Sequence, residues 1–375
     1  MASGTVRQRD PRMDVIRLTA LFFVCATHFF LESGYMDEPV RGPLMYFMTV
    51  LKGLFIICVP LFITLTGYLQ CEKKLTARYF KGIVKVLLIY LICSVIYTVF
   101  ARWIAGNPKY AGSLLHLARV FVVKLLSYRG TPYGWYIEMY IGLFLIIPFV
   151  NLGLEKLDTR RKANLLMIVL FLLIGLPSVM NVFSFESAEA FLHTQKVTRY
   201  TQLVPDWWNS IYPIFYYCLG WYLKKYPVRP KLGLHVSLAV AAVLLDAGFN
   251  YFKSDGMKFV AAAWNWDASS AFQMFTTFAI FSLMLRIPLK PAAGKGAAVL
   301  KLLSDSVLAA YLLSRIFDEV FYGKLKAAVE AVPARFPYLP LIAAAVFLCS
   351  MALSVVVTLA VRAASLPFGK AGRRP

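Results

Sequence analysis

Long apolar blocks separated by short polar segments dominate the chain. A helix needs about 20 apolar residues to cross the ~30 Å hydrocarbon layer of a membrane. The blocks that satisfy this lie at residues 15–34, 44–70, 82–104, 134–152, 164–183, 207–223, 232–250, 268–287, 306–322 and 340–361. The pattern therefore predicts an all-α integral membrane protein with about ten transmembrane helices and both termini on one side.

The composition agrees with this pattern. Of the 375 residues, 59% are hydrophobic and 16% are charged, and the mean hydropathy is +0.65. Apolar side chains exceed what one soluble core can bury, so lipid must cover the rest. We expect one polytopic membrane domain over residues 1–375. The first block contains Arg17 and His28 and lacks a signal-peptide cleavage site, so we expect it to be retained as a span.

Lysine and arginine are distributed unevenly between the two sets of loops. Of the 40 Lys and Arg residues, 24 lie in the tails and the loops on the N-terminal side of the membrane, and 13 lie in the opposite loops. Basic loops resist translocation, which predicts cytoplasmic tails at 1–14 and 362–375. Topology and anionic membrane lipid explain most of the net charge of +21. The charge is not interleaved with aromatic residues, so we expect no nucleic-acid partner.

A shorter amphipathic segment lies between the third and fourth blocks. Residues 114–127 (LLHLARVFVVKLLS) alternate between apolar and basic positions and are too short and too charged to cross a membrane. We predict a helix lying in the interface. The six cysteines lack CxxC spacing and the histidines lack metal-ligand spacing, so we expect neither disulfides nor a metal site.

Ionisable side chains inside the first block are the strongest functional signal. Such groups are costly in lipid and usually face a polar interior. Arg17 and His28 are eleven residues apart, close to three helical turns, so they share a helix face about 16 Å apart along the axis. Glu32 lies one turn beyond His28 on that face, where its carboxylate could orient the imidazole.

Two interpretations of His28 remain open on this pattern. As a general base it would take a proton from an acceptor hydroxyl, because imidazole ordinarily titrates near neutral pH. As a structural residue it would bond to a neighbouring backbone carbonyl. Glu32, close to the outer interface, could likewise be catalytic or simply solvated.

A row of cations marks the approach to the third block. Arg78, Lys81 and Lys85 recur at spacings of three and four, which places them along one helix face at the membrane surface. They could hold the phosphates of a nucleotide-like donor through charge-assisted hydrogen bonds. The excess of basic residues in cytoplasmic loops offers a plainer explanation.

Four short motifs follow one another along the chain. They are Arg17 with ten intervening residues before His28, PLFITLTGYLQ from Pro60 to Gln70, Arg78 three residues before Lys81, and GWYIEMYIGLFLIIP from Gly134 to Pro148. In this order they resemble the motifs of the acyltransferase-3 family, bacterial membrane enzymes that O-acylate surface glycans. The segment SVLAAYLLSR differs from the family's motif, because Ser314 occupies a position at which the family usually has histidine.

The resemblance implies a membrane O-acyltransferase, in particular an O-acetyltransferase of the bacterial cytoplasmic (inner) membrane. It implies acyl-CoA, commonly acetyl-CoA, as a co-substrate from the cytoplasm, no permanently bound cofactor, and a glycan or glycolipid acceptor. Arg17 and the row of Arg78, Lys81 and Lys85 would hold the donor phosphates, and the thioester would reach His28. The acceptor, the acyl group and the oligomeric state do not follow from the sequence.

Further polar residues are secondary candidates. Glu138 lies four residues into its block and could be catalytic or could pair with His28, Lys52 or Arg315. Trp135 belongs to the Trp-Tyr motif of the resemblance and is a candidate for binding substrate.

The ninth block carries several charges. Arg315 and Asp318 lie one turn apart and predict an ion pair in the bundle interior, although Arg315 could instead bind substrate. The same residues permit a second function, a proton-coupled secondary transporter or glycan exporter. In that case protons would be relayed by His28, Glu32, Glu138 and Asp246, and Arg315 would bind an anionic substrate.

Overall fold

The computed structural model describes residues 9–193, 197, 199–258, 268–289 and 294–370. Within these ranges the chain forms helices joined by turns and loops and holds no β-strand, which confirms the all-α prediction. The longer helices are α1 (Pro11–Glu32), α2 (Gly42–Phe55), α3 (Cys58–Gln70), α5 (Ile83–Val99), α6 (Leu114–Leu126), α7 (Trp135–Glu155), α8 (Arg160–Ile174), α11 (Tyr212–Lys225), α12 (Leu232–Ser254), α13 (Ala271–Met284), α14 (Lys295–Ala328) and α16 (Leu339–Lys370). Short helices are α4 (Ala77–Phe80), α9 (Pro177–Met180), α10 (Ala188–Leu192), α15 (Val332–Arg335), the 3-10 turns Tyr35–Asp37, Pro108–Tyr110, Asn209–Ile211 and Phe336–Tyr338, and the π turn Phe100–Ile104.

Eight helical stretches of the described chain are long and apolar enough to cross a membrane, and four of them join neighbouring helices, namely Gly42–Gln70, Ala77–Ile104, Arg160–Met180 and Val332–Ala363. This supports a multi-pass membrane protein. Helices α11 and α13 occupy the predicted spans at 207–223 and 268–287, but each has 14 residues. Because a full crossing needs about 20, the predicted count of ten is not confirmed.

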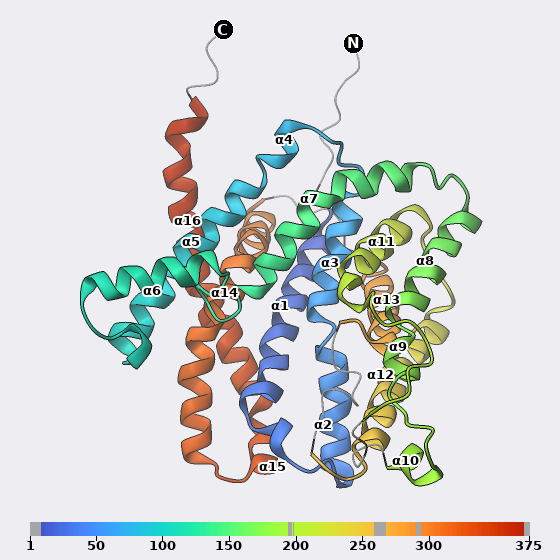
Figure 1. The fold of residues 1–375 in the computed structure, drawn as a ribbon. Helices are drawn as coiled ribbons and strands as arrows, with labels where there is room; N and C mark the ends of the chain where they lie inside the picture. Colours follow the sequence, from blue (N-terminus) through green and yellow to red (C-terminus); the bar gives the residue numbers. More distant parts are fainter. Residues whose placement is uncertain (1–8, 194–196, 198, 259–267, 290–293, 371–375) are drawn as a thin grey trace.

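Helix α1 begins and α16 ends at the same end of the bundle, which is the upper end in Figure 1. That this end is cytoplasmic remains a prediction. Helix α1 begins at Pro11 and α16 continues to Lys370, so each predicted tail includes part of a helix, and where the tails leave the membrane remains a prediction. Residues 1–8 and 371–375 of the two predicted tails lie outside the described ranges.

Helix α1 runs through the middle of the bundle and contacts α3, α14 and α16 (Figure 1). Its start is well specified, because the Asp10 side chain accepts a hydrogen bond from the backbone N–H of Arg12 at 3.0 Å and Pro11 fills the first helical position. Both features favour a helix N-terminus. Since other helices surround α1, its polar side chains face the protein interior.

The predicted span at 44–70 is a broken helix, because α2 stops at Phe55 and α3 starts at Cys58. Two glycines then hold α3 against α11. A Cβ at Gly67 would lie 2.0 Å from the carbonyl oxygen of Tyr217, and a Cβ at Gly220 would lie 2.0 Å from that of Thr64. The backbones of α3 and α11 are therefore in direct contact, which fixes the position of α3 relative to α11.

We expect Gly220→Ala to destabilise the folded protein, by about 1–3 kcal/mol or more, because the added methyl group forces α3 and α11 apart. Thermal unfolding in detergent should show a lower Tm. The control is Gly233→Ala on α12, where a Cβ meets no atom within 4 Å. Equal Tm values for the two variants would contradict the close packing.

The predicted interfacial segment forms helix α6. The hydroxyl of Ser113 caps it by accepting from the backbone N–H of His116 at 3.2 Å. None of its residues is buried, and it lies across the direction of the long helices beside α5 (Figure 1). Its position at the membrane interface remains a prediction.

Candidate active site

His28 meets a carboxylate that comes from α14. Its Nδ1 lies 2.9 Å from Oδ2 of Asp318, which is fully buried. The hydroxyl of Tyr133 donates to the same oxygen at 2.7 Å, and the Tyr133 ring stacks on the imidazole with centroids 4.2 Å apart. An ionised carboxylate favours the proton on Nδ1, which leaves the Nε2 lone pair available. This arrangement suits a general base.

Glu32 and Asp318 have hydrogen-bond partners in the structure other than those that the sequence predicted. Glu32 does not orient His28, because it accepts a hydrogen bond from Nη1 of Arg315, whose Nε donates to Glu319 at 2.8 Å. Asp318 in turn bonds to His28 and not to Arg315. One physical reason is that the guanidinium of Arg315 can bind two carboxylates at once. The other is that spacing along one helix does not show which residues of neighbouring helices face it. Any catalytic role of Glu32 stays a prediction.

The free side of His28 faces a cavity of about 440 Å³, which we call the His28 cavity. Among the described residues no second hydrogen bond reaches the imidazole, so Nε2 is left for a ligand in this cavity. Its walls come from α1, the start of α3, the beginning of α7 with the segment before it, Tyr311 of α14, and the segments 209–212 and 268–269. No Asp, Glu, Lys or Arg is among the described residues that line it.

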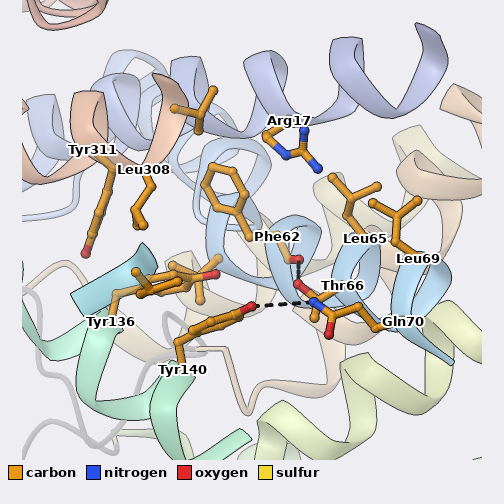
Figure 2. A pocket seen from close by; sticks show the side chains of 13 residues that line it. Arg17, Phe62, Leu65, Thr66, Leu69, Gln70, Tyr136, Tyr140, Leu308 and Tyr311 are labelled. Atoms are coloured by element: carbon orange, nitrogen blue, oxygen red, sulfur yellow. Dashed lines mark hydrogen bonds between the residues drawn. The ribbon is translucent and has the colours of Figure 1, made fainter. Parts of the chain in front are cut away.

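A second cavity of about 210 Å³ lies nearer the upper end of the bundle, and we call it the Arg17 cavity. In Figure 2, Arg17 reaches from α1 towards Leu65 and Leu69 of α3, while Tyr136 and Tyr140 stand on the opposite side. The guanidinium donates to the hydroxyl of Ser304 at 2.5 Å. The cavity thus combines one cation with mainly apolar and aromatic walls.

A third cavity of about 720 Å³, the vestibule, begins at the upper end of the bundle. It is lined by Arg9, Asp10, Arg12, Met13, Asp14, Arg17, Tyr68, Leu69 and Lys224. Arg17 and Leu69 also line the Arg17 cavity, and Val59 and Tyr311 line both the Arg17 cavity and the His28 cavity. The three cavities therefore adjoin in series from the start of α1 to His28.

The predicted cation row does not line these cavities, although Lys85 interacts electrostatically with Asp305, which pairs with Arg9 of the vestibule at 3.6 Å. Arg78, Lys81 and Lys85 are exposed, and none of them lines the three cavities. Arg9, Arg12 and Lys224 bring cations to the vestibule instead. Whether the row binds phosphate remains a prediction. Which of the basic residues line the vestibule could not be read from spacing along the chain.

Trp135 and Glu138 both lie in the first turn of α7 but have different surroundings. Trp135 lines the His28 cavity, although 44% of its surface is exposed. Glu138 is exposed and lines none of the three cavities. It makes no ion pair with His28, Lys52 or Arg315, so the predicted pairing is not formed.

The buried charge of Asp246 lies in a separate cluster between α2, α12 and α13. Its carboxylate accepts from Asn250 at 2.9 Å and from Gln273 at 2.8 Å, and it interacts electrostatically with Lys52. These interactions agree with a structural role for Asp246 in the bundle interior. Across the described ranges, no group of three His, Cys, Asp or Glu side chains is arranged to hold a metal ion.

Comparison with known families decides the general activity. A family model described as an acyltransferase domain, that of the acyltransferase-3 family, matches residues 10–361. The chain belongs to the acyltransferase-3 family. No curated protein and no solved structure matches the chain. Membership supports an acyltransferase and favours the enzyme over the transporter among the two functions that the sequence permits.

Ser314 occupies a position at which this family usually has histidine, and the structure shows its surroundings. The Ser314 hydroxyl is buried and donates to the backbone oxygen of Tyr311 at 2.9 Å, and not to His28. One turn further along α14, Asp318 supplies the contact to the imidazole. The sequence offered a signal for Asp318, since it is a carboxylate inside an apolar block, but its partner could not be read from spacing.

Proposed function

We propose that the protein transfers an acyl group, and acetyl first among candidates, from cytoplasmic acyl-CoA to a hydroxyl of an extracytoplasmic or lipid-linked glycan. The observation that carries this proposal is the series of three cavities that ends at His28. Acyl-CoA has a charged nucleotide end, a slender pantetheine arm and a thioester at its tip. The vestibule is charged and has the larger volume, and the Arg17 cavity is smaller and mainly apolar, so the order of cavities matches the order of these parts.

The reaction proposed at His28 is general-base catalysis. The acceptor hydroxyl enters the His28 cavity and gives its proton to Nε2 as its oxygen attacks the thioester carbonyl. Asp318 stabilises the imidazolium that forms, because its carboxylate holds the Nδ1 proton. The proton then passes to the departing CoA thiolate, which leaves an ester on the acceptor.

The test uses purified protein in vesicles with radiolabelled acetyl-CoA and a panel of glycan acceptors. Acetyl-CoA does not cross lipid, so donor added to one side reports the side of its site. Protease cleavage of the basic loops identifies vesicles whose cytoplasmic face points outward. We expect turnover only in these vesicles. Equal turnover with donor on either side would overturn the proposed direction, and no transfer to any hydroxyl acceptor would overturn the function.

Arg17→Ala should raise the KM for acyl-CoA about tenfold or more while kcat changes less, because the guanidinium meets the donor and not the reacting carbonyl. Steady-state kinetics with varied donor measures this. Arg78→Ala is the matched control, since Arg78 is an exposed arginine that lines none of the cavities. A larger KM effect at Arg78 than at Arg17 would return the donor site to the cation row.

A further inference from the structure

The His28 cavity has one wall whose polar side chains are not bonded to the protein. Asn209 and Ser210 belong to the 3-10 turn that leads into α11, and both line this cavity. In the part of the chain that the structure describes, neither side chain makes a hydrogen bond. Another lining residue, Tyr311, differs, because its hydroxyl donates to the backbone oxygen of Tyr133 at 3.0 Å. The turn before α11 therefore presents polar groups that the fold itself does not use.

Asn209 carries the clearest sign of a ligand. Its Oδ1 is buried, and no donor of the described structure reaches it. Buried polar atoms are normally hydrogen-bonded, so such an exception calls for a partner. Asn181 is half-buried like Asn209, but its Oδ1 accepts from the backbone N–H groups of Leu203 at 2.9 Å and Val204 at 3.1 Å. The fold thus uses the amide of Asn181 and leaves that of Asn209 to the cavity.

The groups that line the cavity are uncharged and suit a particular class of ligand. No Asp, Glu, Lys or Arg is among its described residues, and Trp135 lines it with 44% of its surface exposed. An indole offers a broad apolar face, and an amide can both donate and accept. A sugar ring has apolar C–H faces and several neutral hydroxyls, which match these two groups. The volume of about 440 Å³ lies within the range of small-molecule sites.

We propose that Asn209 is a specificity-determining residue of acyl transfer, which binds a second hydroxyl of an uncharged sugar ring whose reacting hydroxyl lies at His28. This rests on the proposed function and adds how the acceptor is selected. His28 comes from α1 and Asn209 from the turn before α11, so the two contacts together orient the ring. Asn209 takes no part in the proton transfer. An acceptor that lacks the second hydroxyl leaves the amide unpaired and binds more weakly.

The test compares wild type with Asn209→Ala, using acetyl-CoA and the methyl glycosides of glucose, galactose, mannose and N-acetylglucosamine. We expect the KM for the best of these acceptors to rise about tenfold, the effect of one hydrogen bond. The kcat and the KM for acetyl-CoA should stay within threefold, and Tm should not change, because no described residue bonds to this side chain. An unchanged acceptor KM would overturn the proposal. A fall in kcat alone would also overturn it, since the amide would then act on the reacting thioester.

Asn181→Ala is the matched control for losing a half-buried amide. Asn181 lines none of the three cavities, and its hydrogen bonds join two segments of the chain. We expect a lower Tm and an acceptor KM at the wild-type value. An equal rise of the acceptor KM in both variants would make the effect structural and reject the role of Asn209.

Monodeoxy analogues of the best glycoside identify the second hydroxyl. In wild type, one analogue should lose about tenfold in kcat/KM, and in Asn209→Ala the same analogue should lose less than twofold, because its partner is already gone. Equal losses in both proteins would overturn the contact. A wild-type protein that acetylates other hydroxyl compounds but none of these glycosides would overturn the sugar site and leave the acyltransferase intact. Transfer to no hydroxyl acceptor at all would overturn the proposed function itself.

Discussion

His28→Ala is expected to lower acyl transfer at least 100-fold, and to background in a standard assay, while the protein still folds. General-base catalysis contributes typically 10²-fold to 10⁴-fold, and this variant removes the only imidazole among the described residues that line the His28 cavity. Folding should survive because the side chain borders a cavity and not a packed apolar core. The measurement is acetyl transfer at saturating donor and acceptor, with Tm recorded in the same detergent.

His235→Ala is the control for losing a buried histidine. His235 is 2% exposed, its Nε2 lies 2.9 Å from the hydroxyl of Ser282, and it lines none of the three cavities. We expect it to lower Tm but to keep the kcat of the folded fraction. His28→Ala with near wild-type turnover would exclude His28 as the base, whatever the control shows.

Asp318→Asn is expected to lower kcat by about two to four orders of magnitude with little change in the KM for acyl-CoA. An amide can no longer hold the proton on Nδ1 with a full negative charge, so the correct tautomer and the imidazolium both lose support. Asp318 is a positioning residue, because it acts through His28. Steady-state kinetics with each substrate varied separates the two constants.

Asp246→Asn provides the comparison for Asp318→Asn. Asp246 is 1% exposed and hydrogen-bonded, so it matches Asp318 in burial, but it lies in the separate cluster with Asn250 and Gln273. Its loss should act on stability and leave kcat of the folded protein near wild type. If both variants lost kcat equally, the effect of Asp318 would be structural and its role at His28 would be rejected.

The first helix illustrates what periodicity can predict. Arg17 and His28 face the interior at different depths, as three helical turns require, and they line different cavities. The row of Arg78, Lys81 and Lys85 illustrates the limit, because its spacing predicted a shared helix face but not that none of the three would line the vestibule. Local spacing fixes neighbours along one helix and leaves open where that helix goes.

By itself, the sequence determined the all-helical fold, the apolar helices suited to a membrane and the shared face of Arg17 and His28 on α1, because these depend on composition and on the 3.6-residue period. Only the tertiary structure decided that Asp318 and not Glu32 meets His28, that the second predicted span breaks before Cys58, and that three cavities adjoin. These features depend on contacts between helices far apart in the chain. The physical reason is that a buried polar atom takes the partner that packing brings within hydrogen-bonding distance, and sequence separation does not enter that choice.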